Sequence, residues 1–162
     1  MRVAEAYDPQ ITREVVARFG GRPEMLIQIL HGLIERFACI PEAAIRQLAD
    51  ELNLSRADVH GVVSFYDDFR TEPPGRHVVK ICQAEACQAM GGRALTRHAR
   101  EVLGIDLHET GNDISLDPVY CLGNCACSPA IMIDGRTYGR VSEERFDALI
   151  GALDGKAAGS ET

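Results

Sequence analysis

The chain has 162 residues, 46% hydrophobic and 25% charged, which is the balance of a folded protein with one ordinary domain or two small ones. Its 17 basic and 24 acidic residues give a net charge of −7, so the surface as a whole does not attract nucleic acid or anionic lipid. The most hydrophobic stretch, 25–34, is too short and polar to cross a bilayer, and the first residues lack the apolar core of a signal peptide, so we expect a cytoplasmic protein without direct membrane contact.

The first half of the sequence is predicted to form helices. A short helix over 10–19 ends at a Gly-Gly pair. Apolar residues over 25–37 recur at steps of three and four, which indicates an amphipathic helix, and a proline opens the next helix over 41–52. Ser55, followed three residues later by an acidic residue, predicts the capped start of a fourth helix that runs to Phe69.

Two of these helices also resemble a helix-turn-helix, over 43–65. Their charge argues against DNA binding, because residues 41–69 hold two basic side chains and six acidic ones, a local net charge of −4. We therefore expect no nucleic-acid partner. Packing against a partner subunit and against the second half of the chain is the expected role of these helices.

The second half changes to a mixed pattern after Thr71–Gly75, where two prolines and a glycine mark a boundary. The expected elements are a strand (77–81), a helix (88–103), a strand (114–120), two strands (130–133 and 137–141) joined by an Asp-Gly turn, and a serine-capped helix to Leu153. This order matches the common core of the thioredoxin fold. We predict an α/β protein with an amino-terminal helical bundle (1–75), a thioredoxin-like domain (76–154) and a flexible tail (155–162).

Four of the six cysteines form two pairs, Cys82-x4-Cys87 and Cys121-x3-Cys125. Each pair follows a predicted strand, and the two strands are neighbours in a thioredoxin-like sheet, so the four thiolates can converge at one edge. In a [2Fe–2S] cluster each iron takes two soft thiolate ligands besides the bridging sulfides, which two such pairs supply. Nearby backbone N–H groups, including that of Gly123, could stabilise the anionic cluster.

Other readings of the cysteines remain open on spacing alone. Structural zinc also takes four cysteines in pairs of this kind, whereas disulfides are unusual in the cytosol. No Cys-x-x-Cys motif indicates a thioredoxin-like oxidoreductase, and no histidine pair indicates a Rieske centre. Cys39 ends an apolar helix and is interpreted as a core residue, and Cys127 as a non-ligand.

With these residues in hand, the chain over 9–153 resembles the thioredoxin-like [2Fe–2S] subunit of respiratory complex I and its relatives in soluble NAD-linked enzymes. The helical part of that family is matched by Val63–Tyr66, and its ligand pairs, Cys-x3-4-Cys and Cys-Leu-Gly-x-Cys, match the two pairs above. Within the family, Ile81–Gly92 and Val119–Ala130 most resemble the gamma subunit of soluble, NAD-dependent molybdenum formate dehydrogenase. The complex I branch usually has Thr and Pro beside the first cysteine pair.

The resemblance implies a thioredoxin-like [2Fe–2S] ferredoxin domain whose single cluster is bound by Cys82, Cys87, Cys121 and Cys125. The implied role is electron transfer in a cytosolic NAD-dependent formate dehydrogenase, beside a flavin subunit with FMN, NAD and a [4Fe–4S] cluster and a molybdenum subunit that oxidises formate. The chain has no dinucleotide fingerprint, molybdenum signature or acid–base constellation, so we expect a non-catalytic subunit. Complex I, an NAD-linked bidirectional hydrogenase and a zinc-stabilised binding module are the alternatives.

Overall fold

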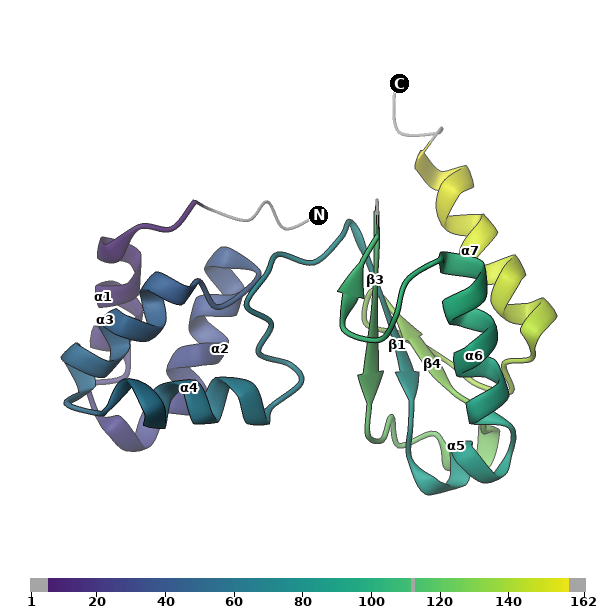
Figure 1. Ribbon diagram of the computed structural model, residues 1–162, viewed down its shortest axis with the longest axis horizontal. Helices are drawn as coiled ribbons and strands as arrows, with labels where there is room; N and C mark the ends of the chain where they lie inside the picture. Colours follow the sequence, from purple (N-terminus) through teal and green to yellow (C-terminus); the bar gives the residue numbers. More distant parts are fainter. Residues whose placement is uncertain (1–5, 112, 158–162) are drawn as a thin grey trace. The chain divides into compact units, whose positions relative to one another are not determined.

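The computed structural model describes residues 6–111 and 113–157, and the chain divides into two compact units, Met1–Pro74 and Gly75–Thr162 (Figure 1). The first unit is built of helices, and the second combines a five-stranded sheet with helices. This is the order that the sequence predicts. Within the described ranges, no helix is long and apolar enough to cross a membrane.

The elements of the first unit are α1 (Pro9–Arg18), the 3-10 turn η1 (Pro23–Met25), α2 (Leu26–Phe37), α3 (Glu42–Leu52) and α4 (Arg56–Phe65). The predicted start of α4 is confirmed, because Ser55 and Asp58 form a capping box with each other's backbone amides. The helix ends at Phe65 rather than at Phe69. Tyr66 is extended, and the turn that follows brings Phe69 back into the core.

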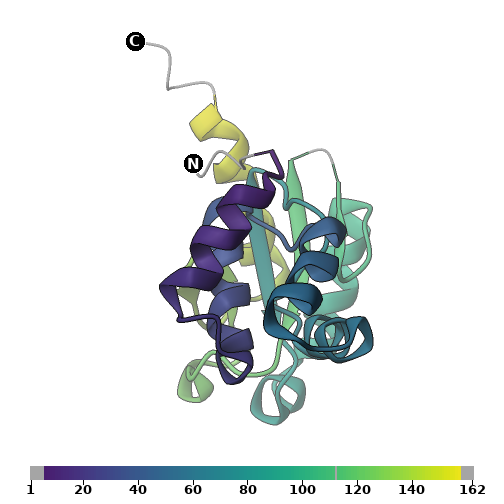
Figure 2. The same ribbon diagram turned by 90° about the vertical axis from the view of Figure 1, so that its left-hand side faces the viewer.

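The core of the first unit consists of the helix faces that the periodicity predicts. Its completely buried side chains from α2, α3 and α4 include Ile29, Leu30, Leu33, Leu48 and Val59. α1 lies so close to α2 that a Cβ atom on Gly32 would meet Val15 Cγ1 at 2.7 Å. Figure 2 shows the helices of this unit from the side that is at the left in Figure 1.

The elements of the second unit are β1 (His77–Cys82), α5 (Glu85–Ala89), α6 (Gly92–Leu103), β2 (Glu109–Thr110), β3 (Ile114–Val119), the 3-10 turn η2 (Cys125–Cys127), β4 (Ile131–Ile133), β5 (Arg136–Tyr138) and α7 (Glu143–Ala157). The strand order is β2-β3-β1-β4-β5. β1 is parallel to β3 and antiparallel to β4, so it lies at the centre of the sheet. α6 and α7 lie side by side (Figure 1), and both contribute to the core around the central strands.

Four details of the second unit differ from the sequence prediction. The single helix expected over 88–103 is two helices, because the chain breaks at Met90 and Gly91, where Gly91 has a φ of +96°. The short strand β2 was not predicted, and β5 is shorter than expected. α7 extends to Ala157, beyond the predicted end at Leu153, and the rest of the predicted tail, 158–162, lies outside the described residues.

Candidate metal centre

The two cysteine loops leave the sheet at the same edge, because β1 and β3 are parallel neighbours. Cys82, the last residue of β1, is in register with Val119, the last residue of β3. The amide of Gln83 donates to the Val119 carbonyl (2.8 Å), and the amide of Cys82 donates to the Ala130 carbonyl (3.1 Å). The end of β1 is therefore tied both to β3 and to the segment that enters β4.

The first pair, Cys82 and Cys87, is buried, with 3% and 2% of each residue exposed. Together with Ala130 the two cysteines form a small apolar cluster at this end of the domain. Burial raises the pKa of the Cys82 thiol, and its hydrogen bond with Cys87 acts in the same direction. The backbone amides of Ala84 and Leu122 donate to the same sulfur and oppose this shift, so N–H groups already point at Cys82.

Cys87 lies inside the short helix α5 and is linked to the second loop by Ser128. Burial raises the pKa of the Cys87 thiol, but hydrogen bonds with the Ser128 hydroxyl, the Cys82 thiol and the Ala130 amide outweigh burial and lower this pKa. The Cys87 Sγ and Ser128 Oγ atoms are 3.5 Å apart. The Ser128 hydroxyl also donates to the carbonyl of Cys125 at 2.8 Å. One buried side chain thus connects both cysteine loops.

The second pair, Cys121 and Cys125, is exposed. The amide of Gly123, in the left-handed region with a φ of +69°, donates to Cys121 Sγ at 3.3 Å, as the sequence suggested. Repulsion from the Cys121 thiolate is the main cause that raises the pKa of Cys125, and the charge of Cys87 adds to it. The four predicted residues therefore lie on two loops at the same edge of the sheet, with one pair buried and the other exposed.

The other two cysteines have different surroundings. Cys39 is buried in the first unit, and burial raises its pKa, in agreement with a core role. Cys127 is half-buried beneath the connection between β5 and α7. A Cβ atom on Gly139 would lie 2.6 Å from Cys127 Cβ, and the amide of Arg140 donates to the Cys127 carbonyl at 2.6 Å.

The donor set, four cysteine thiols in two pairs, has the chemistry that a two-iron cluster requires. In the described part of the chain, no group of three or more His, Cys, Asp or Glu side chains is arranged to hold a single metal ion. A [2Fe–2S] cluster needs a different arrangement, because each iron takes two thiolates. Two thiol pairs with amide N–H groups directed at Cys82 and Cys121 meet that requirement.

Sequence reasoning missed Ser128, which contacts both cysteine loops. Its hydroxyl lies 41 positions from Cys87 in the sequence, so the contact depends on how β4 enters the sheet. The available signal was the position of this serine next to a proline, directly after the last cysteine of the loop. That signal by itself does not indicate which thiol the serine contacts.

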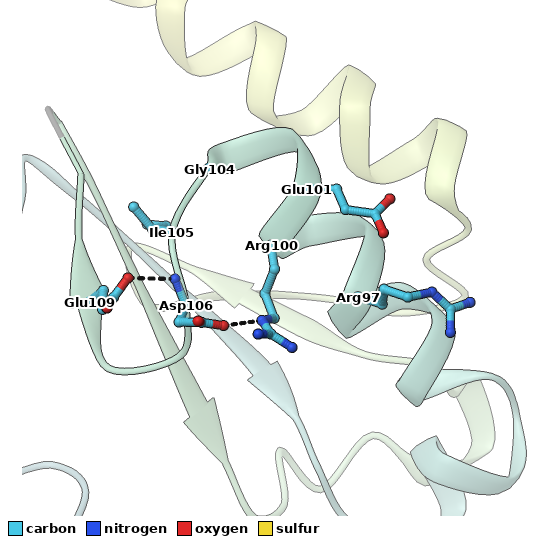
Figure 3. Close-up of a pocket in the computed structure, with 7 residues that line it drawn as sticks. All are labelled: Arg97, Arg100, Glu101, Gly104, Ile105, Asp106 and Glu109. Carbon is cyan, nitrogen blue, oxygen red and sulfur yellow. Dashed lines mark hydrogen bonds and ion pairs between the residues drawn. The ribbon is translucent and has the colours of Figure 1, made fainter.

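A separate pocket of about 350 Å³ lies at the carboxyl end of α6 (Figure 3). Its lining residues are Arg97, Arg100, Glu101, Gly104, Ile105, Asp106 and Glu109. Arg100 forms an ion pair with Asp106, and the amide of Asp106 donates to the Glu109 carboxylate at 2.7 Å. The Arg100 and Asp106 charges are therefore paired, and the lining contains no cysteine or histidine, so the cysteine loops remain the candidate site.

Comparison with known proteins supports this choice. The family model for the thioredoxin-like [2Fe–2S] ferredoxin matches residues 12–154. A subunit of the NADH-quinone oxidoreductase of Pseudomonas aeruginosa is 36% identical over 115 residues, which cover 70% of this chain and 69% of the relative. The HndA subunit of the NADP-reducing hydrogenase of Solidesulfovibrio fructosivorans is 32% identical over 143 residues, which cover 85% of this chain and 84% of the relative.

Solved structures show the same fold. The crystal structure of an NAD⁺-reducing [NiFe]-hydrogenase in the air-oxidised state matches 82% of this chain with a TM-score of 0.64 and 23% identity. The match covers 23% of that chain. The sequence also spans only 57% of the corresponding NADH-quinone oxidoreductase subunit of Mycobacterium tuberculosis strain H37Rv, at 29% identity.

Proposed function

Because the chain belongs to the thioredoxin-like [2Fe–2S] ferredoxin family, we propose that it is the electron-transfer subunit of an NAD-linked oxidoreductase complex, with its cluster bound by Cys82, Cys87, Cys121 and Cys125. Family membership confirms the predicted thioredoxin-like fold and the [2Fe–2S] cofactor. The proposal of these four ligands rests on one observation, the convergence of two cysteine pairs at the carboxyl ends of two parallel neighbouring strands.

The residues around the pairs have roles that suit electron transfer. A [2Fe–2S] cluster takes up and releases one electron at a time. Burial of Cys82 and Cys87 keeps water from the inner thiolates, and the amides of Leu122 and Gly123 donate to sulfur atoms whose negative charge increases on reduction. Exposure of Cys121 and Cys125 keeps the outer side of the site open to a redox partner.

The host that we propose is a cytosolic NAD-dependent formate dehydrogenase. Support comes from the resemblance of Ile81–Gly92 and Val119–Ala130 to the gamma subunit of that enzyme. The partners would then be a flavin subunit with FMN, NAD and a [4Fe–4S] cluster, and a molybdenum subunit that oxidises formate. This chain would carry electrons between them or beside the flavin, and would not bind formate or NAD itself.

A second candidate host is favoured by the named relatives. The NADH-quinone oxidoreductase subunit of Pseudomonas aeruginosa and the HndA subunit of NADP-reducing hydrogenase are both similar to this chain over most of its length. An equivalent [2Fe–2S] subunit of complex I or of a bidirectional hydrogenase therefore fits the same site. In either host the role of the four cysteines is unchanged.

Two measurements test the proposal in sequence. The full chain, purified alone under anaerobic conditions, should contain two irons and two sulfides and should give a rhombic EPR signal after reduction with dithionite. Zinc without iron would refute the cluster assignment. The intact complex, isolated through this chain from its native cells, should then reduce NAD⁺ with formate. If it contains nickel or quinone-reactive membrane subunits instead, the formate assignment is wrong and the cluster assignment stands.

A further inference from the structure

A glutamine directly follows each cysteine of the buried pair, and the two glutamine side chains bond to each other. The Gln88 Nε2 atom donates to both the backbone carbonyl (3.2 Å) and the side-chain oxygen (3.3 Å) of Gln83. This pair of contacts joins the residue after Cys82 to the residue after Cys87. The two ends of the Cys82-x4-Cys87 loop are therefore joined twice, once by the backbone and once by the hydrogen bonds between Gln83 and Gln88.

The link continues into helix α6 at both ends. The Gln83 Nε2 atom donates to Thr96 Oγ1 at 3.0 Å, and the Thr96 hydroxyl donates to the Gly92 carbonyl at 2.8 Å. The Arg93 Nε atom donates to the side-chain oxygen of Gln88. Four side chains thus form one chain of hydrogen bonds, called here the glutamine network: Gln83, Gln88, Arg93 and Thr96.

We propose that the glutamine network positions the buried cysteine pair around the cluster, and that its arginine raises the reduction potential of the cluster. This inference rests on the proposed function, since it presupposes that the pair binds a [2Fe–2S] cluster. The network residues are positioning residues, because the structure records their contacts with one another, with backbone carbonyls and with α6.

The loop needs such support because its own secondary structure is short. α5 has five residues, too few to be stable without tertiary contacts. The chain then breaks at Gly91, so α5 is not continuous with the longer α6. α6 nevertheless lies against the loop, since a Cβ atom on Gly92 would be 2.7 Å from the Cys87 carbonyl oxygen. The network fastens the loop to the first turns of α6, which is anchored in the core by Leu95.

The arginine adds a charge to this framework. Segment 82–92 contains one charged residue, Glu85, and segment 119–130 contains none, so the two cysteine loops bring little charge of their own. Arg93 is the first basic side chain after the loop, and its bond to Gln88 directs it toward the residue next to Cys87. A positive charge near an anionic cluster stabilises the reduced state, in which the cluster carries one more negative charge.

The positioning role is tested with matched substitutions at Thr96 in the full chain. Thr96→Val keeps the shape but removes the hydroxyl that accepts from Gln83, whereas Thr96→Ser keeps the hydroxyl. We expect Thr96→Val and Gln88→Met to lose iron to bathophenanthroline disulfonate at least about fivefold faster than the wild type, because each variant loses two or more hydrogen bonds of the network and one such bond alone corresponds to about fivefold. Both variants should also shift the g-values of the reduced cluster. Thr96→Ser should behave like the wild type in both measurements.

The charge role is tested by comparing Arg93→Gln with Arg97→Gln. Both changes remove one exposed arginine from α6, but Arg97 lies one turn further along, where it lines the pocket of Figure 3. Arg93→Gln should lower the midpoint potential by clearly more than Arg97→Gln, with the difference shrinking at high salt. Equal shifts would overturn the charge role.

The outcomes separate the two levels of the proposal. A wild-type chain that binds no [2Fe–2S] cluster overturns the proposed function and this inference with it. A wild-type chain with a normal cluster, together with Thr96→Val and Gln88→Met variants whose iron loss and g-values are unchanged, overturns the positioning role alone. Thermal unfolding of the apo variants shows whether faster iron loss merely follows global destabilisation. If it does, the variants have a lower Tm and lose iron faster, but the g-values of their clusters stay as in the wild type. That result would also overturn the positioning role.

Discussion

Ser128→Ala removes the one hydroxyl that, among the described residues, contacts both cysteine loops. Ser128 is 8% exposed, so water cannot readily replace its hydroxyl as the partner of the Cys125 carbonyl and the Cys87 thiol. Loss of the 2.8 Å bond to the Cys125 carbonyl should cost about 1 kcal/mol, and loss of the longer 3.5 Å contact with Cys87 about 0.5 kcal/mol. The apo-protein should therefore be about 1.5 kcal/mol less stable, which corresponds to a fall of roughly 6 to 12 °C in the Tm of a domain of this size.

The loaded protein should also respond. The Ser128 hydroxyl donates its one hydrogen to the Cys125 carbonyl in this structure and accepts from the Cys87 thiol. Once the Cys87 sulfur is a thiolate, the hydroxyl can turn and donate to that sulfur instead, and such a bond favours the reduced cluster. We expect the midpoint potential of Ser128→Ala to be about 20 to 40 mV lower, the one-electron equivalent of about 0.5 to 1 kcal/mol. Redox titration followed by EPR at low temperature measures this shift.

Ser142→Ala is the matched control for this prediction. Ser142 accepts from the amide of Arg145 at the start of α7, so the loss of its hydroxyl should also cost about 1 kcal/mol. Within the described part of the chain, the contacts of this hydroxyl are with α7 and not with a cysteine. Ser142→Ala should lower the Tm and leave the potential unchanged. The reasoning is refuted if both variants lower the Tm by similar amounts and neither changes the potential, since Ser128 would then have only a structural role.

Three further predictions concern cysteines and their neighbours. Cys127→Ser should keep the [2Fe–2S] EPR signal, whereas Cys87→Ser should lose or strongly alter it; the reverse result would exchange their roles. Gly139→Ala should lower the Tm and disturb the second cysteine loop, because its Cβ would lie 2.6 Å from both Cys127 Cβ and Asn124 Nδ2, and an unchanged Tm would show that the loop relaxes freely. Burial raises the pKa of Cys39, so its contribution to stability is complete below the unfolded pKa of about 9 and is lost as the pH rises through the folded pKa. Urea unfolding should therefore show that the free energy of unfolding of the wild type falls between pH 8 and 10, and that it falls less in Cys39→Ala. At pH 7 the variant should be less stable than the wild type, because the smaller side chain leaves a cavity.

The placement of the cysteine pairs could be predicted because strand ends are readable from the sequence. Val79 and Ile81 belong to a short β-branched segment, and β1 does end at the first cysteine. That β1 and β3 are neighbours in the sheet followed from the order of elements and is confirmed by their pairing, which the structure shows to be parallel. The capping box at Ser55 was equally predictable from the sequence, because it involves only residues within one helical turn of each other.

Contacts between distant segments could not be predicted in the same way. The helix expected over 88–103 is broken at Gly91, and Gly92 lies so close to the Cys87 carbonyl that a Cβ atom would not fit there. The bond from Gln83 to Thr96 and the contact of Ser128 with Cys87 depend on packing across the fold. Neither leaves a periodic or local pattern in the sequence.

The unequal exposure of the two cysteine pairs bears on how the cofactor is installed. The inner pair is already buried and hydrogen-bonded, while Cys121 and Cys125 stand in the open on a loop with a left-handed glycine. Any donor of iron and sulfide that approaches from solvent can therefore reach the outer thiols before the inner ones. We therefore expect the cluster to be assembled in a fixed order, in which Cys121 and Cys125 bind first and Cys82 and Cys87 bind last.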